Sequence, residues 1–284
     1  MDKFVDFSGF FVEKIGNPLV IGDPNFNYFN PKNERLDLPS YLYDPKSIED
    51  RKAGKVLPKA PFFPQLVETR EEAIEVAKLL KTKSLTGNDA RESTLKSTAS
   101  PRILHLATHG FYIKRGDEAN AEDVDFMTIQ FRGSEYTHPL LRSGIALAGA
   151  NWYADEHVST DGDDDGILNG YDALELELSG TEIAVLSACR TGINDSLGIS
   201  GSLGLRFALA TAGAKSQLTT LWPVYDTTTK DFMVSFYQAL RKGLPKSHAL
   251  REAQNRIRKD PNYGEHPYYW AGYLLYGNQE PINF

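Results

Sequence analysis

The stretch TEIAVLSACRTG, residues 181–192, has the pattern of a β-strand up to Cys189, the single cysteine of this 284-residue chain. The four apolar or small residues before Ser187 are typical of a buried strand, and a glycine-containing loop follows them. One cysteine cannot form an intramolecular disulfide or a thiolate zinc site. Cys189 is therefore either a small core residue, the more common role for a cysteine in this position, or a reactive group.

A second stretch, RILHLATHGFY, has the same organisation. Its apolar run from Ile103 to Ala107 has the length of a strand, and Thr108, His109 and Gly110 follow it. His105 lies inside the run, where we expect a hydrogen-bonded core histidine. His109 and Cys189 thus each stand just beyond the carboxyl end of an expected strand.

Strand-like and helix-like segments alternate along the chain, which predicts an α/β protein with a mostly parallel central sheet and helices on both faces. The length and the 41% apolar content suit one large domain spanning residues 1–284, with an irregular segment at about 24–64. We expect strands at 19–21, 103–107, 181–189, 215–222 and 269–277, and helices at 69–80, 89–96, 198–213, 226–240 and 245–259.

Several local features can be tested against a structure. The residues Gly22 to Pro24 read as a turn that ends the first strand. Thr69 and Glu72 have the spacing of a capping box, and Ile74, Ala77 and Leu80 then fall on one helical face. In the segment 226–240, an apolar face combines Phe232, Phe236 and Leu240 with the adjacent Met233 and Tyr237.

Net charge and hydropathy exclude some classes of protein. The formal charge of −7 and the pI near 5.5 argue against direct nucleic-acid binding, which usually requires a basic face. No stretch approaches the roughly 18 consecutive apolar residues of a membrane span, and the first residues lack the apolar run of a signal peptide. We therefore expect a cytoplasmic protein with no membrane contact.

The two strand ends suggest acyl-transfer chemistry. In a parallel sheet, sites form at the carboxyl ends of strands, where His109 and Cys189 would face each other. The imidazole would then act as the base that activates the thiol. Because Gly110 has no side chain, its backbone N–H could join that of Cys189 in an oxyanion hole. We expect no cofactor and no metal ion for this chemistry.

Several motifs together resemble the CHAT domain, a bacterial caspase-like domain usually associated with tetratricopeptide repeats. They are ILHLATHG, VLSACRTG, LTTLWPVYD and HPYYWAGYLLYG, with LVIGDPNF, VETREEAIEVAKLL and LLRSGIALAGAN upstream or between them, in the order of that family. The resemblance covers nearly the whole chain. It implies a caspase-like three-layer α/β/α sandwich and a cysteine endopeptidase, with Cys189 as nucleophile and His109 as general base and acid.

The resemblance also implies a substrate. Separase-like relatives hold a basic residue before the cleaved bond, at position P1, with an aspartate in the segment similar to LWPVYD. Asp226 is the matching residue here, so we expect cleavage of a protein substrate after a basic residue, with arginine favoured. An aspartate in this position is equally typical of a helix N-cap. Trp222 is either a core aromatic residue or a wall of the substrate pocket.

The chain departs from the family pattern in two ways. It has GISGSLGLRFALA, with Arg206 alone, where many members have a Gly-Glu-Gly stretch and an Arg-Arg-Ala-Phe helix. The residues before Asn17 are too few for one repeat of about 34 residues, so either this is an excised domain or its regulator is a separate chain. By analogy we expect a regulatory partner or tetratricopeptide region, a role in bacterial defence or programmed death, and an RNA-guided CRISPR effector complex as one candidate activator.

Two other functions remain open alternatives. A catalytically weak protein-interaction or signalling module could keep the same fold. A calcium-binding protein is suggested by DGDDDGILNGYD, in which Asp161, Asp163, Asp165 and Asp172 fit a calcium-loop spacing. The twelfth residue of that loop is aspartate instead of glutamate, and no amphipathic helix precedes it. A solvated acidic loop is thus the favoured interpretation.

Overall fold

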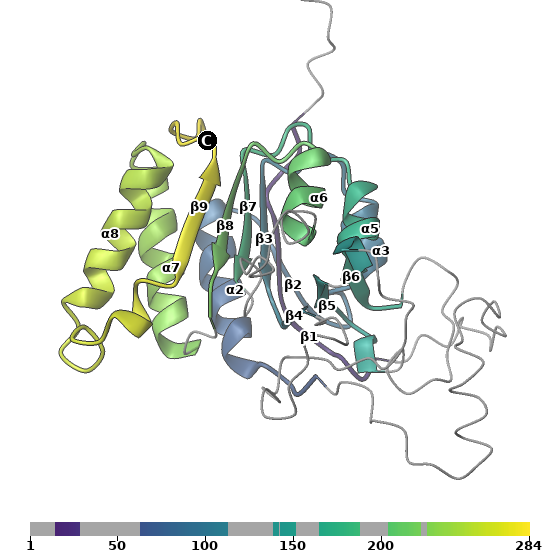
Figure 1. The fold of residues 1–284 in the computed structure, drawn as a ribbon, viewed down its shortest axis with the longest axis horizontal. Helices are drawn as coiled ribbons and strands as arrows, with labels where there is room; N and C mark the ends of the chain where they lie inside the picture. The colour runs from purple at the N-terminus through teal and green to yellow at the C-terminus, as the bar shows by residue number, and fades with distance from the viewer. Residues whose placement is uncertain are drawn as a thin grey trace, which may run out of the picture.

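The centre of the molecule is a six-stranded sheet of order β2-β1-β3-β7-β8-β9, in which β9 alone runs antiparallel (Figure 1). The computed structural model describes residues 15–28, 63–112, 139–141, 143–151, 165–187, 204–222 and 226–284. The strands are β1 (Leu19–Pro24), β2 (Ser84–Gly87), β3 (Ile103–Ala107), β7 (Ile183–Ser187), β8 (Ser216–Thr220) and β9 (Tyr273–Gly277).

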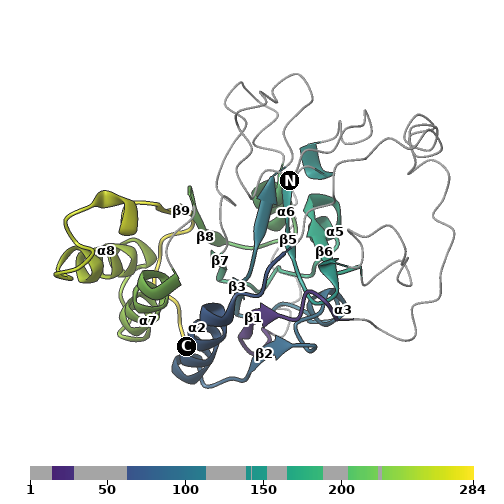
Figure 2. The ribbon, with the colours of Figure 1, turned by 90° about the horizontal axis from the view of Figure 1, so that it is seen from below.

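Helices cover both faces of this sheet, which gives three layers (Figures 1 and 2). One layer holds α2 (Val67–Leu80), α7 (Asp226–Arg241) and α8 (Lys246–Arg258). The other holds α3 (Glu92–Lys96), α5 (Gly170–Leu174) and α6 (Leu205–Thr211). The expected α/β/α sandwich with a mostly parallel sheet is therefore confirmed.

The strands carry apolar side chains on both faces because each face has its own helical layer. On β7, Ile183 and Val185 pack in the core cluster that includes α2, α7 and α8. Ala184 and Leu186 belong to the opposite cluster, with residues of α3, α5 and α6. This alternation explains why the apolar run before Cys189 has no polar interruption.

The long helix α7 matches its expected amphipathic pattern. Phe232, Phe236 and Tyr237 are fully buried, as are Met233 and Leu240. The ring of Phe232 stacks on Tyr273 of β9, with 3.5 Å between ring centroids and 9° between ring planes. Helix α7 thus covers the sheet while the opposite side of the helix faces water.

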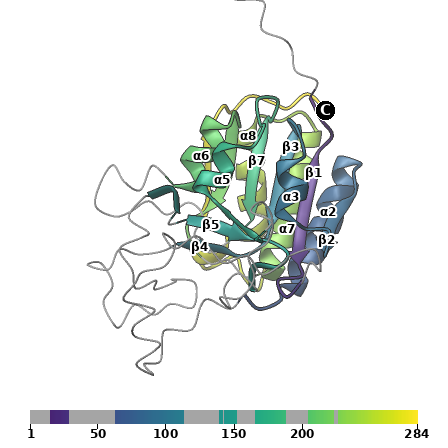
Figure 3. The ribbon, with the colours of Figure 1, turned by 90° about the vertical axis from the view of Figure 1, so that its right-hand side faces the viewer.

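A small antiparallel sheet of order β4-β5-β6 leads away from the end of β3 (Figure 3). Its strands are β4 (Gly110–Tyr112), β5 (Ser143–Ala146) and β6 (Ile167–Asn169). Ala146 N–H donates to the His109 carbonyl at 2.9 Å, and the Thr108 hydroxyl donates to the Ala146 carbonyl at 2.5 Å. These bonds fix the backbone where β3 passes into β4. Two 3-10 turns, η3 (Pro139–Leu141) and η5 (Pro267–Tyr269), complete the described elements.

Three local expectations were wrong. The first strand does not end in a turn at Gly22, because β1 continues to Pro24 with a register shift. Helix α2 begins at Val67 and its N-cap, Leu66, makes no side-chain cap bond, so Thr69 and Glu72 form no capping box. Ile74 is 36% exposed and does not share the buried face of Ala77 and Leu80.

Thr69 and Glu72 instead serve contacts between elements. The Thr69 hydroxyl accepts a hydrogen bond from Asp23 N–H at 3.0 Å and thereby joins α2 to β1. Glu72 Oε1 lies 3.1 Å from His105 Nε2, and His105 Nδ1 is 3.0 Å from the Tyr237 hydroxyl. All three members of this Glu72–His105–Tyr237 cluster are buried, so polar contacts link α2, β3 and α7 through the core. The expectation of a hydrogen-bonded core histidine at His105 is confirmed.

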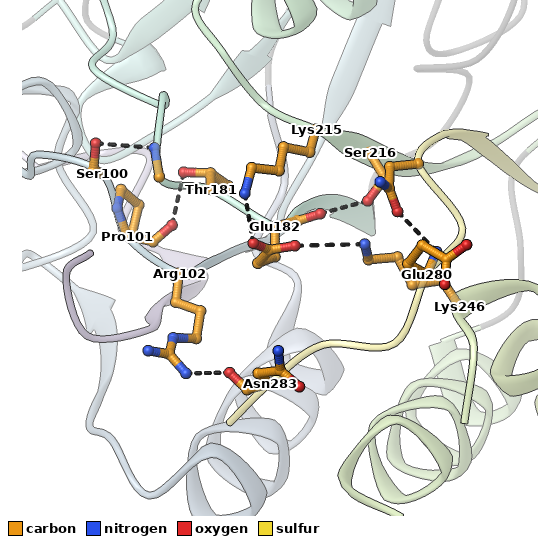
Figure 4. Close-up of polar contacts among 12 residues, drawn as sticks. Ser100, Pro101, Arg102, Thr181, Glu182, Lys215, Ser216, Lys246, Glu280 and Asn283 are labelled. Carbon is orange, nitrogen blue, oxygen red and sulfur yellow. Dashed lines mark hydrogen bonds and ion pairs between the residues drawn. The ribbon is translucent and has the colours of Figure 1, made fainter. Parts of the chain in front are cut away.

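The last residues of the chain lie against the edge at which β3, β7 and β8 begin (Figure 4). Arg102 donates to the Asn283 carbonyl, and Lys246 N–H donates to the Gln279 carbonyl at 2.9 Å. Glu182 Oε1 lies 2.7 Å from Lys215 Nζ. Burial lowers the pKa of Lys246, whose ammonium is 3.7 Å from the second Glu182 oxygen. The amino edge of the sheet is thus covered, and the site must be sought at the opposite edge.

We predict that Tyr237→Phe lowers the free energy of unfolding by about 1–3 kcal/mol. The ring can still pack, but His105 Nδ1 loses its partner inside the core. Chemical denaturation followed by circular dichroism measures the loss. Tyr171→Phe, at an exposed position of α5, is the control and should cost less than about 0.5 kcal/mol. Equal effects of the two substitutions would show that the buried contact has no energetic role.

Candidate active site

His109 lies just beyond the carboxyl end of β3, between the ends of the neighbouring strands β1 and β7. The residue is only 2% exposed. Its Nε2 atom is 2.8 Å from the carbonyl oxygen of Pro64, which precedes α2. A carbonyl can only accept, so this contact requires the proton on Nε2 and leaves the lone pair of the neutral ring on Nδ1. Nδ1 is buried and has no hydrogen-bond partner within the described part of the chain.

Aromatic rings enclose the imidazole. The ring centroid of His109 is 5.2 Å from that of Phe26 and 5.7 Å from that of Phe63. Burial lowers the pKa of His109 below its usual 6.5 because it disfavours the imidazolium, and this outweighs the Pro64 carbonyl, which acts in the opposite direction. At neutral pH the ring is therefore uncharged, as a general base must be before it accepts a proton.

Asn151 holds the segment that carries the Pro64 carbonyl. Its Oδ1 accepts from Phe63 N–H at 2.8 Å, and its Nδ2 donates to the Phe63 carbonyl at 3.0 Å. Its own N–H donates to the Phe26 carbonyl at 3.0 Å. Asn151 thus holds two of the segments around His109, one through its side-chain amide and the other through its backbone N–H. Sequence reasoning missed both Asn151 and Pro64, although Asn151 is the last residue of the quoted motif LLRSGIALAGAN.

The pairing of β3 with β7 relates His109 to the cysteine strand. Ala107 is in register with Ser187, and Thr108 N–H donates to the Ser187 carbonyl at 3.3 Å. His109 is two residues beyond Ala107, and Cys189 is two residues beyond Ser187. Cys189 itself lies outside the described residues, so its contact with His109 stays a prediction. Gly110 is the first residue of β4, and its role as an oxyanion donor also stays a prediction.

Trp222 lies two residues beyond the end of β8, at the same edge of the sheet as His109. Its indole N–H donates to the Tyr268 carbonyl at 2.9 Å, and its ring stacks on that of Tyr268 at 6.0 Å. Gly272 allows this packing, because a Cβ there would lie 2.8 Å from the indole ring. Trp222 is partly buried, which fits either of its expected roles. Asp226 is the first residue of α7, but its side chain is outside the described part.

The described residues of the suspected calcium loop make other contacts. Asp172 Oδ2 accepts from Asn169 N–H at 3.2 Å within a capping box of α5, and Asp172 Oδ1 lies 3.4 Å from Lys96 Nζ. Lys96 is also 2.8 Å from the buried carboxylate of Glu92. Burial raises the pKa of Glu92 and of Asp165. A lysine ammonium thus supplies positive charge here, and Asp161 and Asp163 lie outside the described residues.

The described residues contain no group of three or more histidine, cysteine or acidic side chains arranged to hold a metal ion. They also contain no helix with the length and apolar character needed to cross a bilayer.

The central sheet, its helical layers and the histidine at the end of β3 define a caspase-like α/β protein. Comparison with protein families identifies it further: the family model of the CHAT domain matches residues 11–278. The chain belongs to the CHAT domain family, a family of the caspase-like peptidase type. The motifs quoted from the sequence had predicted this membership.

Two curated relatives carry the name tetratricopeptide repeat protein 28. The human protein is 27% identical over 241 residues, and the mouse protein is 26% identical over 252 residues. Each match covers 84% of this chain and 9% of the relative. This chain is thus similar to a small part of much longer proteins whose name specifies tetratricopeptide repeats.

We predict that the pKa of His109, followed by NMR of the ring nitrogens, lies below 6.5 in the wild-type protein and rises in Phe63→Ala. Removing the phenyl ring admits water to the imidazole and reduces the cost of the imidazolium. The spectra should also show the proton on Nε2. His109→Gln assigns the signal, and Phe207→Ala, at an exposed position of α6, is the control. A wild-type pKa at or above 6.5 would contradict this account.

Proposed function

We propose that this protein is a cysteine endopeptidase in which Cys189 and His109 form the catalytic dyad. The observation that carries the proposal is the His109 imidazole at the end of the strand paired with β7. The Pro64 carbonyl holds it through Nε2, and Nδ1 has no hydrogen-bond partner among the described residues. A buried ring nitrogen without a hydrogen-bond partner is costly, and the Cys189 thiol of the proposed dyad would supply a partner for His109 Nδ1. Membership of a caspase-like family supports the same proposal.

Each residue of the proposed site has a chemical role. His109 Nδ1 takes the proton of the Cys189 thiol, and the thiolate attacks the carbonyl carbon of the scissile bond. The N–H groups of Gly110 and Cys189 hold the resulting oxyanion. The imidazolium, stabilised by the Pro64 carbonyl, returns its proton to the leaving amine as the carbon–nitrogen bond breaks. Water then hydrolyses the thioester and restores the free thiol.

The proposed specificity is for arginine at P1. Trp222 and the start of α7 lie beyond the end of β8, one strand from β7 along the sheet. A carboxylate at Asp226 would bind a guanidinium through paired, charge-assisted hydrogen bonds, which favours arginine over lysine. Trp222, already fixed by Tyr268, would form one wall of the pocket.

Control by a partner forms part of the proposal. The names of the curated relatives specify tetratricopeptide repeats, and this chain corresponds to 9% of their length. We infer that a repeat region, on the same or another chain, regulates the peptidase. A bacterial defence pathway with an RNA-guided effector complex as activator is the specific form that we propose for this control.

One observation favours a second candidate, an interaction module with weak catalysis. His109 is only 2% exposed, and the aromatic rings of Phe26 and Phe63 lie against it. A base enclosed in this way would need a rearrangement before it could exchange protons with a substrate. The two candidates differ in the reactivity of Cys189, since the peptidase requires a thiol that the imidazole activates.

We predict that Cys189→Ala and His109→Ala each abolish nearly all cleavage in a peptide-library digest with the activated protein. The melting temperature should stay within a few degrees of wild type for Cys189→Ala, whose sulfur is proposed to serve chemistry. In the same preparations, iodoacetamide should label Cys189 at pH 7 in the wild type and much more slowly in His109→Ala. Cleavage near the wild-type rate by either variant would exclude the dyad. Absence of both cleavage and labelling would favour the interaction module.

We predict that Asp226→Asn lowers kcat/KM at least tenfold on an arginine substrate without unfolding the protein. The loss of one charge partner of a buried guanidinium costs about 2–5 kcal/mol, whereas the amide oxygen can still cap a helix. Alkylation of Cys189 should change little. Asp231→Asn, which removes a charge from an exposed position on the same helix, is the matched control. Full activity of Asp226→Asn on the arginine substrate would show that Asp226 serves only to cap the helix.

A further inference from the structure

We propose that a pocket at the carboxyl ends of β1 and β2 is a substrate subsite that binds a carboxylate on the leaving-group side of the scissile bond. The pocket has a volume of about 450 Å³ and is lined by Asp23, Asn25, Gln65, Val67, Arg70 and Asn88, among others. The inference rests on the proposed peptidase function and adds to it a second determinant of specificity.

The sheet order places this pocket on one particular side of the dyad. Asp23 belongs to the end of β1, and Asn88 directly follows β2. His109 follows β3, so the order β2-β1-β3-β7-β8 separates the pocket from Trp222 by the strands of the dyad. Gln65 in the pocket is adjacent to Pro64, the partner of His109. If P1 lies beyond β8, the pocket is available to residues after the scissile bond.

Arg70 supplies the positive charge of the pocket. Its Nε donates to Asp23 Oδ2 at 2.6 Å, and the Asp23 side chain is 3% exposed while that of Arg70 is 50% exposed. One edge of the guanidinium is thus anchored by a buried carboxylate that also lines the pocket. Among the residues described, its two Nη groups have no hydrogen-bond partner, so the guanidinium has donors left for a ligand.

The charge of Asp23 is already compensated inside the protein. Besides Arg70, Gln65 Nε2 donates to Asp23 Oδ1 and, at 3.0 Å, to the Pro24 carbonyl. Asp23 adopts a left-handed backbone conformation, with φ of 45°, which is costly for a residue with a side chain. The fold therefore tolerates strain to hold this carboxylate beneath Arg70, and the positive group is the one that faces a ligand.

The rest of the lining fits an acidic side chain. Asn25 Nδ2 donates to Asn88 Oδ1 at 2.8 Å, which fixes one wall. Val67, 62% exposed, offers an apolar surface for methylene groups. Val67 is also the first residue of α2, whose first turn already carries Glu68, so the attraction for an anion comes from the Arg70 guanidinium and not from the helix end. A guanidinium binds a carboxylate through two parallel hydrogen bonds.

In a peptide substrate the carboxylate has two sources, a glutamate or aspartate side chain and the C-terminus. Quenched fluorescent peptides with arginine at P1 and either glutamate or glutamine at successive positions after the scissile bond can distinguish them. Each peptide is made with an amidated and with a free C-terminus. The enzymes compared are wild type, Arg70→Gln, Arg70→Lys, the double variant Asp23→Asn with Arg70→Gln, and Lys78→Gln as a matched control on the same helix.

We expect glutamate to raise kcat/KM about tenfold over glutamine at one position in the amidated peptides, as one charge-assisted contact would. This preference should fall below about twofold in Arg70→Gln. It should fall equally in the double variant, in which Asp23→Asn removes the buried carboxylate that Arg70→Gln alone would leave without its cation. It should persist in Lys78→Gln. Arg70→Lys, which keeps the charge but not the paired geometry, should show an intermediate preference. A preference for the free C-terminus alone would assign the pocket to a terminal carboxylate.

Binding separates this inference from the proposed catalysis. The same peptides, labelled with a fluorophore and mixed with Cys189→Ala, are followed by fluorescence anisotropy with and without Arg70→Gln. If the glutamate peptide binds more tightly and this gain depends on Arg70, the subsite is supported even when the wild type cleaves nothing. Absence of cleavage by the wild type would overturn only the proposed peptidase function. The subsite would be overturned if the glutamate and glutamine peptides, with either C-terminus, were bound and cleaved equally. It would also be overturned if a preference for the carboxylate were unchanged in Arg70→Gln.

Discussion

The parallel pairing of β3 with β7 is the constraint on which the rest of the site depends. Both strands are apolar on both faces, and a shift of either strand by one residue would exchange its side chains between two differently packed core clusters. The register of Ala107 with Ser187 is fixed as a result. Each strand then delivers the next residues of the chain to the same edge of the sheet, where His109 is enclosed by Phe26 and Phe63.

The surroundings of His109 have opposite effects at different stages of the proposed reaction. Burial against Phe26 and Phe63 keeps the resting imidazole neutral and therefore basic. The same burial would penalise the imidazolium that forms once the thiol is deprotonated, and the Pro64 carbonyl is the group placed to offset that penalty. The carbonyl oxygen does not titrate, so it can stabilise the imidazolium at any pH. A carboxylate partner could not, because it loses its charge when it is protonated.

Sequence reasoning succeeded where a residue pattern follows directly from burial. The apolar runs of β3 and β7 and the face of α7 were predictable because each element packs one or two continuous surfaces. The predicted capping box was wrong although Thr69 and Glu72 have the right spacing. Thr69 bonds to β1 and Glu72 lies beside His105, so neither side chain caps the start of the helix. The Pro64 carbonyl could not be predicted, since every residue has a backbone carbonyl and its clamp, Asn151, is 88 residues from Phe63 in the sequence.

The final residues of the chain cross the amino edge of the sheet, where Ile282 is buried and Arg102 holds the Asn283 carbonyl. Phe284 consequently emerges at the opposite end of the strands from His109, as the position of the C-terminus in Figure 1 shows. An affinity tag or surface linker attached there would leave the histidine edge open to macromolecules. Removal of the last few residues for such an attachment would instead take an anchor out of the core, so extension is the sounder engineering choice.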